Sequence, residues 1–256
     1  MTEIWADQPF KLIPTMVMTG AKANPTVSHI ANEMVLAHNA MIRCLNSIYL
    51  QAPYLKSDAD SRDILQYAKF WIEWIHHHHE TEEHVLFPGF EREAGVEGIM
   101  AANVVQHHEF AAGFDTFVKY VKDCLDGKSE ERFEATKFRQ LIDGFASKLT
   151  LHLADEIQTL LSLDKYDEKK MHKVYVEFEN VVKNGDFKKD ELYPLVVGSH
   201  DKAFKGGEDF PPVPQFVIYL VAYWLSRKHR SVWRFNPCDF FGKKRPLLFV
   251  PTVEGR

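Results

Sequence analysis

Residues 25–163 contain four successive stretches in which apolar residues recur every three or four positions. That spacing places the apolar side chains on one face of an α-helix. Short polar segments separate the stretches, and nothing between them has the pattern of a β-strand. The pattern predicts an all-α protein whose core is an antiparallel up-down-up-down four-helix bundle. The expected helices span about residues 25–52, 57–88, 97–125 and 131–163.

Residues at the expected helix ends support these boundaries. Asn24 is a suitable N-cap, and Pro25 suits the first helical position because an N–H there would have no helical acceptor. We expect Pro88 and Gly89 to end the second helix, since proline cannot donate a helical hydrogen bond. The second helix has three candidate N-caps, which are Ser57, Asp58 and Asp60.

The C-terminal third of the chain has a different character. Residues 167–183 and 215–225 have helical patterns, and a proline-rich stretch and an aromatic tail accompany them. This region is too apolar for a disordered linker. We therefore expect a four-helix bundle at residues 25–163 and a helical and irregular extension at residues 164–256, which packs on the bundle as a cap or lid.

Composition narrows the class of protein. The net charge of −5 gives no basic surface for nucleic acid, and 45% hydrophobic residues suffice for a sizeable core. The longest apolar run, Phe216 to Leu225, is too short to span a bilayer, and the N-terminus lacks the apolar stretch of a signal peptide. Cys44, Cys124 and Cys238 are widely spaced, which fits a reducing compartment. We expect a cytoplasmic protein with no nucleic-acid partner and no membrane span.

Histidines and glutamates lie among the apolar positions of all four stretches. Each stretch has a histidine in phase with its apolar residues, and the second and fourth add a glutamate one turn later. Residues four apart share a helix face, so these side chains would point into the bundle. Two buried carboxylates are costly unless a cation neutralises them. The predicted metal ligands are His38, His78, Glu82, His107, His152 and Glu156.

Two divalent ions bridged by both glutamates would neutralise the buried charge. Nitrogen and oxygen ligands favour iron, manganese or zinc over calcium or magnesium. The plainer alternative is a structural bundle with a single zinc ion or no metal, because a buried histidine or a helical His-x3-Glu pair often has no metal-binding role.

Several neighbouring residues stay open as alternatives. His107 competes with His108 for one ligand position, and helical phase favours His107. His79 and Asp155 are alternates in the second and fourth stretches. Two tyrosines on inward faces are candidates to donate a proton or an electron, although packing in the core is their plainer role: Tyr49 and Tyr67.

At these residues the sequence resembles the hemerythrin-like (HHE cation-binding) family. The resemblance covers about residues 25–163, and the C-terminal extension is similar to that of uncharacterised fungal members. It implies a four-helix bundle with a non-haem di-iron centre that meets O2 or a related molecule such as NO. The segments that carry the resemblance are AHNAMIRCL around His38, HHETEEHVLFP from His78, QHHEF around His107, and HLADEIQTLL from His152.

The chain departs from the oxygen-carrying members of that family at two positions. Those members have five histidines, with His-x3-His on the third helix, whereas Ala111 stands four residues after His107. They also have His-x4-Asp on the last helix, whereas this chain has His152 and Glu156. Fewer imidazoles would leave more open coordination positions, which favours reaction with O2 over its carriage.

Two functions from different classes are consistent with these features. The first is a non-haem di-iron oxidoreductase that activates O2 to oxidise a small organic substrate, with the extension shaping a pocket. The alternative is binding of O2 or NO, iron storage, or sensing without catalysis, with the extension as a partner or homodimer surface. Arginines of the extension are weaker candidates to hold an anionic substrate group: Arg227, Arg230 and Arg234.

Overall fold

The computed structural model describes residues 4–127 and 130–251, and these ranges contain helices and loops but no β-strand. The all-α prediction is therefore confirmed for the described residues. The α-helices are α1 (Met16–Thr19), α2 (Pro25–Gln51), α3 (Asp58–Thr81), α4 (Phe87–Ala94), α5 (Ala101–Asp126), α6 (Ala135–Asp143), α7 (Ala146–Leu161), α8 (Glu168–Asn184), α9 (Lys189–Ser199) and α10 (Gln215–Tyr223).

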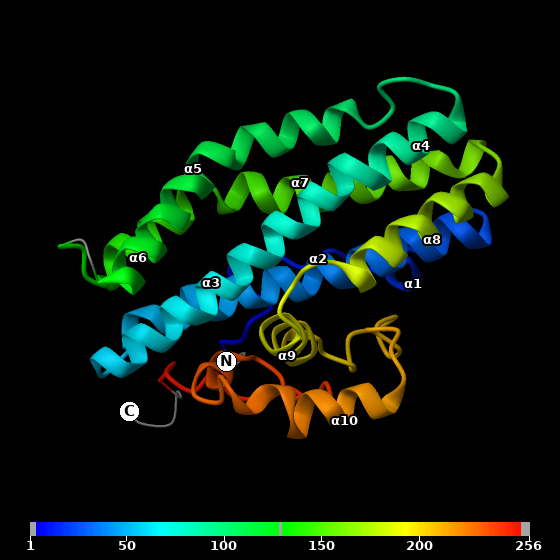
Figure 1. Ribbon diagram of the computed structural model, residues 1–256. Coiled ribbons are helices and arrows are strands. Elements are labelled where there is room, and N and C mark those ends of the chain that lie inside the picture. Colours follow the sequence, from blue (N-terminus) through cyan, green and yellow to red (C-terminus); the bar gives the residue numbers. More distant parts are fainter. Residues whose placement is uncertain (1–3, 128–129, 252–256) are drawn as a thin grey trace.

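The helices α2, α3, α5 and α7 lie side by side and form the bundle (Figure 1). The helix α2 packs against α3 and α7, and α5 packs against the same two helices. Their apolar faces meet in one continuous hydrophobic cluster, which includes the fully buried Trp71, Phe117 and Leu45. Any polar group on an inward face of these helices is therefore removed from water.

The predicted starts of the first two helices are confirmed. The side chain of Asn24 accepts a hydrogen bond from the Val27 N–H, and Pro25 occupies the first turn of α2. Among the three candidate caps of α3, the structure selects Ser57, whose Oγ accepts from the Asp60 N–H at 3.2 Å. These side chains satisfy N–H groups that have no acceptor within the helix.

The predicted end of the second helix at Pro88 and Gly89 is wrong. After α3 the chain forms a π-helical turn at Glu82–Leu86, closed by a bond from the Phe87 N–H to the Glu82 carbonyl, and then continues as α4. Pro88 falls in the first turn of α4, where a missing N–H is tolerated. The true end is Gly95, whose left-handed φ of 68° suits glycine.

The third and fourth expected helices also differ from the structure. The helix α5 begins at Ala101 rather than near residue 97. The fourth is broken into α6 and α7, which are separated by Gly144 and Phe145. The helix α5 passes close to this break, because a Cβ added to Gly113 would lie 2.9 Å from the Gly144 carbonyl oxygen. A close backbone crossing of this kind leaves no trace in the apolar period.

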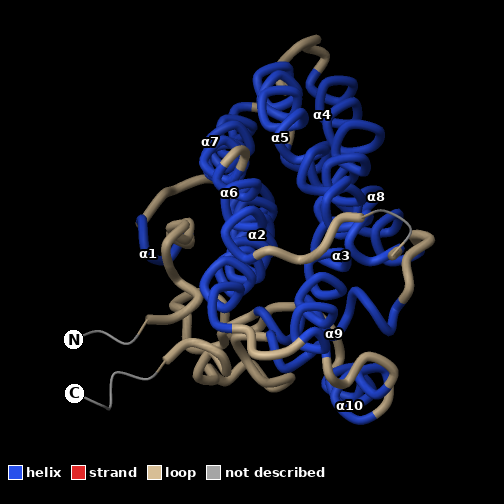
Figure 2. Tube along the Cα trace, turned by 90° about the vertical axis from the view of Figure 1, so that its left-hand side faces the viewer, coloured by secondary structure: helices blue, strands red, loops and turns tan. Residues whose placement is uncertain are grey.

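The extension packs mainly on α2, α3 and α4, and α10 lies on the opposite side of the molecule from α5 (Figure 2). Hydrogen bonds tie it down: the Ser47 hydroxyl donates to the Phe235 carbonyl at 2.5 Å. Met171 of α8 and Leu195 of α9 belong to the same hydrophobic cluster as the bundle. No helix within the described ranges is both long and apolar enough to cross a membrane.

The contact between α4 and α8 gives a stability test. A Cβ at Gly89 would lie 2.6 Å from Cγ1 of Val174 in α8. Alanine in place of a mid-helix glycine normally stabilises by about 0.5–1 kcal/mol. Here we expect Gly89→Ala to lower the free energy of unfolding by about 1–3 kcal/mol, because the added methyl overpacks the contact. Urea denaturation measures the change.

The control for this prediction is the double variant with Val174→Ala, which removes the methyl groups facing Gly89. In that background Gly89→Ala should cost clearly less than in the parent chain, as expected for residues in contact. An equal loss in both backgrounds, or a gain in stability from Gly89→Ala alone, would contradict the contact.

Candidate metal centre

The structure brings all six predicted ligands together, and a seventh side chain joins them. All seven are buried, and four of them are fully excluded from solvent: His38, Glu82, His152 and Glu156. They come from all four bundle helices and from the π-helical turn. The residues are His38 of α2, His78 and His79 of α3, Glu82 of the π turn, His107 of α5, and His152 and Glu156 of α7.

The imidazoles that face the centre form two close pairs. Nε2 of His38 lies 2.9 Å from Nε2 of His78, and Nε2 of His107 lies 2.9 Å from Nε2 of His152. Two nitrogen ligands that share one ion at about 2.1 Å, at roughly a right angle, are themselves about 3 Å apart. Each pair therefore has the spacing expected of two ligands to the same ion.

Each glutamate reaches one histidine of each pair. The Glu82 carboxylate lies 2.8 Å from Nε2 of His78 in the first pair and 3.8 Å from Nε2 of His107 in the second. Oε2 of Glu156 lies 3.5 Å from Nε2 of His38 in the first pair and 3.9 Å from Nε2 of His152 in the second. This arrangement suits carboxylates that bridge two ions.

Hydrogen bonds on the outer side of the rings fix their orientation. Nδ1 of His38 donates to the Leu153 carbonyl at 2.8 Å, and Nδ1 of His107 donates to the Glu83 carboxylate at 2.5 Å. Because both partners are acceptors, Nδ1 carries the proton and Nε2 keeps its lone pair toward the centre. Such outer partners are usual for metal-binding histidines.

The protonation behaviour of the histidines fits the same role. Burial lowers the pKa of His78 to about 3 and that of His152 to about 2, and the neighbouring His107 lowers that of His152 further. Burial also lowers the pKa of His38 well below its usual value. These imidazoles are therefore neutral near pH 7, which is the form that binds a metal.

The glutamates carry the strongest indication of a cation. Burial raises the pKa of both Glu82 and Glu156 well above the usual value, and repulsion from Glu83 and from Glu82, respectively, adds to the effect. None of their four carboxyl oxygens accepts a hydrogen bond from a backbone, hydroxyl or amide donor among the described residues, and their polar neighbours are each other and the surrounding imidazoles. Buried polar atoms are rarely left in that condition. A cation between them would satisfy all four oxygens, so the residues present fit a metal centre.

His79 is the seventh member, which the sequence offered only as an alternate. Its Nε2 is buried without a hydrogen-bond partner, and its ring centroid lies 4.3 Å from that of His107 and 5.2 Å from that of His152. Two sets of atoms could each hold an ion, with the ligand atoms of each set within 4.8 Å of one another. The sets are His38, His78, Glu82 and Glu156, and His79, Glu82, His107 and His152.

The π-helical turn explains why two adjacent glutamates both reach the centre. The Glu82 N–H lies at the junction of α3 and the turn, where it donates to the His78 and His79 carbonyls. The wider turn then lets both Glu82 and Glu83 reach His107. A π turn within an α-helix frequently marks a functional site. Sequence reasoning missed Glu83, and the acidic ETEE segment was its only signal.

Other candidates lie away from the centre. His108 is exposed, and Asp155 is an exposed residue that accepts a hydrogen bond from Gln106 at 2.9 Å. Gln106 in turn lies 3.3 Å from Nδ1 of His152, so Asp155 acts on the centre only through another side chain. The two candidate tyrosines are Tyr49 on α2 and Tyr67 on α3. Each is eleven residues from the nearest proposed metal-binding residue on its own helix, which corresponds to about 16 Å along the helix axis.

Together, the helical bundle and its buried histidine and carboxylate cluster define a metal-binding protein. The chain belongs to the hemerythrin HHE cation binding domain family, whose model matches residues 29–163. It is 39% identical over 254 residues to "Dimeric xanthone biosynthesis cluster protein R11" of Cryptosporiopsis sp. (strain 8999), covering 98% of this chain and 95% of that protein. No solved structure matches the chain.

Substitution of Glu82 tests its position in both ligand sets. Glu82→Leu should lose most of the bound metal, because each set contains Glu82. Without metal, the variant should have a free energy of unfolding about 1–3 kcal/mol higher than that of the parent. The reason is that an apolar side chain replaces a buried unpaired carboxyl group. Elemental analysis and denaturation measure the two effects. The exposed Glu80 provides the control, and Glu80→Leu should change neither quantity.

The two histidines of the QHHEF segment provide a matched pair. His107→Ala should lower the metal content by about half, because only one ligand set contains His107. His108→Ala should leave the metal content unchanged, because that side chain is exposed. Elemental analysis of both variants decides the assignment, and an equal loss from both would refute it.

Proposed function

We propose that the protein is a non-haem di-iron oxidoreductase that activates O2 to oxidise a small organic molecule. His38, His78, His79, His107 and His152 would hold the two ions, and Glu82 and Glu156 would bridge them. When bound, the iron ions supply O2 binding and the transfer of electrons to it. Manganese or zinc suits the same atoms, so iron is part of the proposal.

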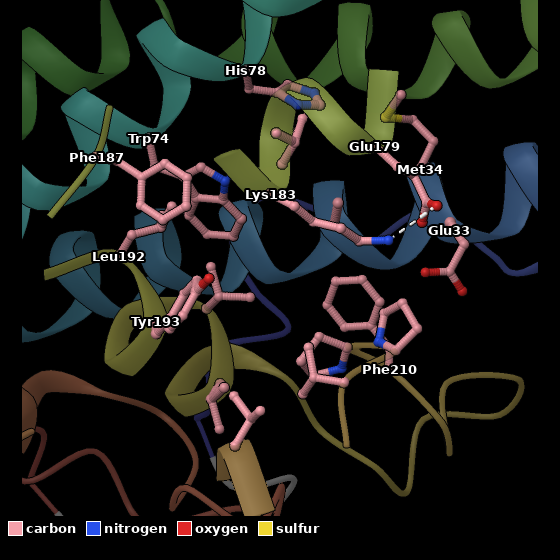
Figure 3. A pocket seen from close by; sticks show the side chains of 18 of the residues that line it. Glu33, Met34, Trp74, His78, Glu179, Lys183, Phe187, Leu192, Tyr193 and Phe210 are labelled. Atoms are coloured by element: carbon pink, nitrogen blue, oxygen red, sulfur yellow. Dashed lines mark hydrogen bonds and ion pairs between the residues drawn. The ribbon is translucent and has the colours of Figure 1, made fainter. Parts of the chain in front are cut away.

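A cavity beside the centre is the observation that carries the proposal. It measures about 250 Å³, and His78 forms part of its wall (Figure 3). The bundle helices α2 and α3 form one side, and α8, α9, α10 and the loop at 210–213 form the other. A protein that only binds O2 or stores iron has no need of a ligand-sized apolar cavity against a metal ligand.

The residues of this chain would contribute binding, orientation and exclusion of water. The hydrogen bonds from His38 and His107 hold their Nε2 atoms toward the ions. A ligand in this apolar cavity would exclude water from the side of the centre next to His78 and would strengthen electrostatic interactions there. The name of the fungal relative refers to a biosynthesis cluster for dimeric xanthones, which are aromatic compounds, and an oxidase suits such chemistry.

The arginines expected to hold an anionic group do not line this cavity. They line a separate depression near the C-terminal end of α10. One of them, Arg234, pairs with Asp60 at 2.7 Å and with Asp63 at 2.8 Å. We therefore assign no substrate-binding role to Arg227, Arg230 or Arg234.

His79 removes an argument against the second candidate function, which is binding of O2 or NO, iron storage, or sensing without catalysis. Because Ala111 stands where an oxygen carrier has a histidine, the sequence predicted four metal-binding histidines instead of five. The smaller number favoured an enzyme. The ring of His79 lies within the second ligand set and restores the number to five. The ligand count therefore no longer separates the two functions, and the cavity becomes the deciding feature.

Oxygen consumption tests the proposal. The ferrous protein, shown by elemental analysis to hold about two iron ions per chain, is mixed with O2 in the presence and absence of a panel of phenols and a chemical reductant. We expect sustained O2 uptake and an oxidised product with at least one phenol, and no uptake from His38→Ala. Reversible O2 binding without consumption would favour the second candidate, and fewer than about 1.5 metal ions per chain would refute the dinuclear centre.

A further inference from the structure

The wall of the cavity beside His78 is almost wholly apolar and aromatic. Aromatic and branched apolar side chains line the space on both sides, and Figure 3 labels several of them. Trp74 and Phe187 lie near His78 at one end, and Phe210 lies toward the other. Val217 and Val221 of α10 close the side opposite the bundle. Such a wall binds an aromatic ligand through apolar contact.

One edge of the cavity is polar, and it contains a carboxyl group without a partner. Glu33 of α2 is half-buried, and its carboxylate makes no hydrogen bond or ion pair within the described residues. Glu179 and Lys183 of α8 lie beside it but pair with each other at 3.1 Å. Burial raises the pKa of Glu33 to about 7, and repulsion from Glu179 and Asp209 adds to the effect. Glu33 is therefore available to a polar group on a ligand.

The volume limits the size of the ligand. An apolar cavity of about 150 Å³ accepts benzene, and pockets for drug-sized molecules start at about 300 Å³. A space of about 250 Å³ lies between these values. It suits two or three fused rings.

The charges limit the chemical class of the ligand. The polar edge carries two carboxyl groups and one ammonium group, and the ammonium already pairs with one of the carboxylates. A ligand carboxylate would be repelled there and would lose its hydration in an apolar space. A neutral hydroxyl group can donate a hydrogen bond to Glu33 without that cost.

We propose that this cavity takes a neutral, hydroxylated aromatic molecule of two or three fused rings, with its hydroxyl group on Glu33 and its ring edge toward His78. The assignment names the substrate class of the oxidase proposed above and rests on that function. Glu33 determines specificity by recognising the hydroxyl group, and the ring is held next to the metal centre.

Binding measured without O2 tests the assignment independently of catalysis. The metal-loaded protein is titrated under nitrogen with 2-naphthol, naphthalene and 2-naphthoate by calorimetry. We expect 2-naphthol to bind most tightly and 2-naphthoate most weakly. Glu33→Leu should weaken 2-naphthol roughly tenfold, the effect of one lost hydrogen bond, and leave naphthalene unchanged. Glu33→Gln keeps a hydrogen-bond acceptor and should recover most of that loss.

Two variants of α10 locate the binding. Val217→Trp fills the cavity from α10, a helix that carries none of the proposed metal-binding residues, and it should abolish binding of both 2-naphthol and naphthalene. Leu220→Trp on the same helix is the control, because Leu220 is exposed and does not line the cavity. It should leave both affinities unchanged.

Several outcomes would overturn the assignment. They are equal affinity for 2-naphthol and naphthalene, tighter binding of 2-naphthoate than of 2-naphthol, and binding that survives Val217→Trp. If 2-naphthol binds as expected but no phenol is oxidised, the proposed function fails and the cavity assignment stands. If O2 oxidises a substrate in a protein that does not bind 2-naphthol, only the cavity assignment fails.

Discussion

The two carboxyl groups at the centre of the bundle, Glu82 and Glu156, constrain the rest of the structure. Both are fully buried, and in the described part of the chain their oxygens accept no hydrogen bond from a backbone, hydroxyl or amide donor. A bundle core with two such groups is stable only if they stay protonated or if a cation joins them. The surrounding imidazoles are neutral and supply the remaining ligand atoms for a cation. Metal binding and stability of the bundle are therefore coupled.

The extension changes what this centre can do. In the bundle alone, the face formed by α2 and α3 would meet solvent. The helices α8 and α9 pack on this face, and α10 packs against α9. The space left between them and the bundle is the cavity against His78. Covering a bundle face with a second layer of helices thus contributes to the common core and also forms a ligand-sized cavity.

The sequence predicted which side chains meet inside the bundle because helical phase is a strong constraint. His38, His107 and the pair of His152 and Glu156 lie on straight α-helical stretches, where the period of 3.6 residues decides which side chains face inward. The same reasoning failed where the helix changes its period. After the π turn that begins at Glu82, the helix continues past the predicted end at Pro88 and ends at Gly95. It also brought Glu83 against His107, which phase could not predict.

Contacts between distant segments explain the other differences. The break between α6 and α7 accompanies the close approach of Gly113 to Gly144, and no local pattern encodes that crossing. The cavity likewise depends on residues near 33, 78, 179 and 217 meeting in space. Local patterns predict elements and faces, whereas a cavity depends on how the elements pack.

The two halves of the centre are unequal, and this asymmetry relates the metal site to the cavity. One ligand set has three imidazoles, from His79, His107 and His152, and the rings of Phe87 and Phe110 pack against it. The other set has two imidazoles, and one of them, His78, forms part of the cavity wall. The half with fewer nitrogen ligands is thus the half next to the space for a ligand. A carrier and an oxidase both need an open coordination position for O2, and in the proposed oxidase this arrangement would place that position next to the substrate.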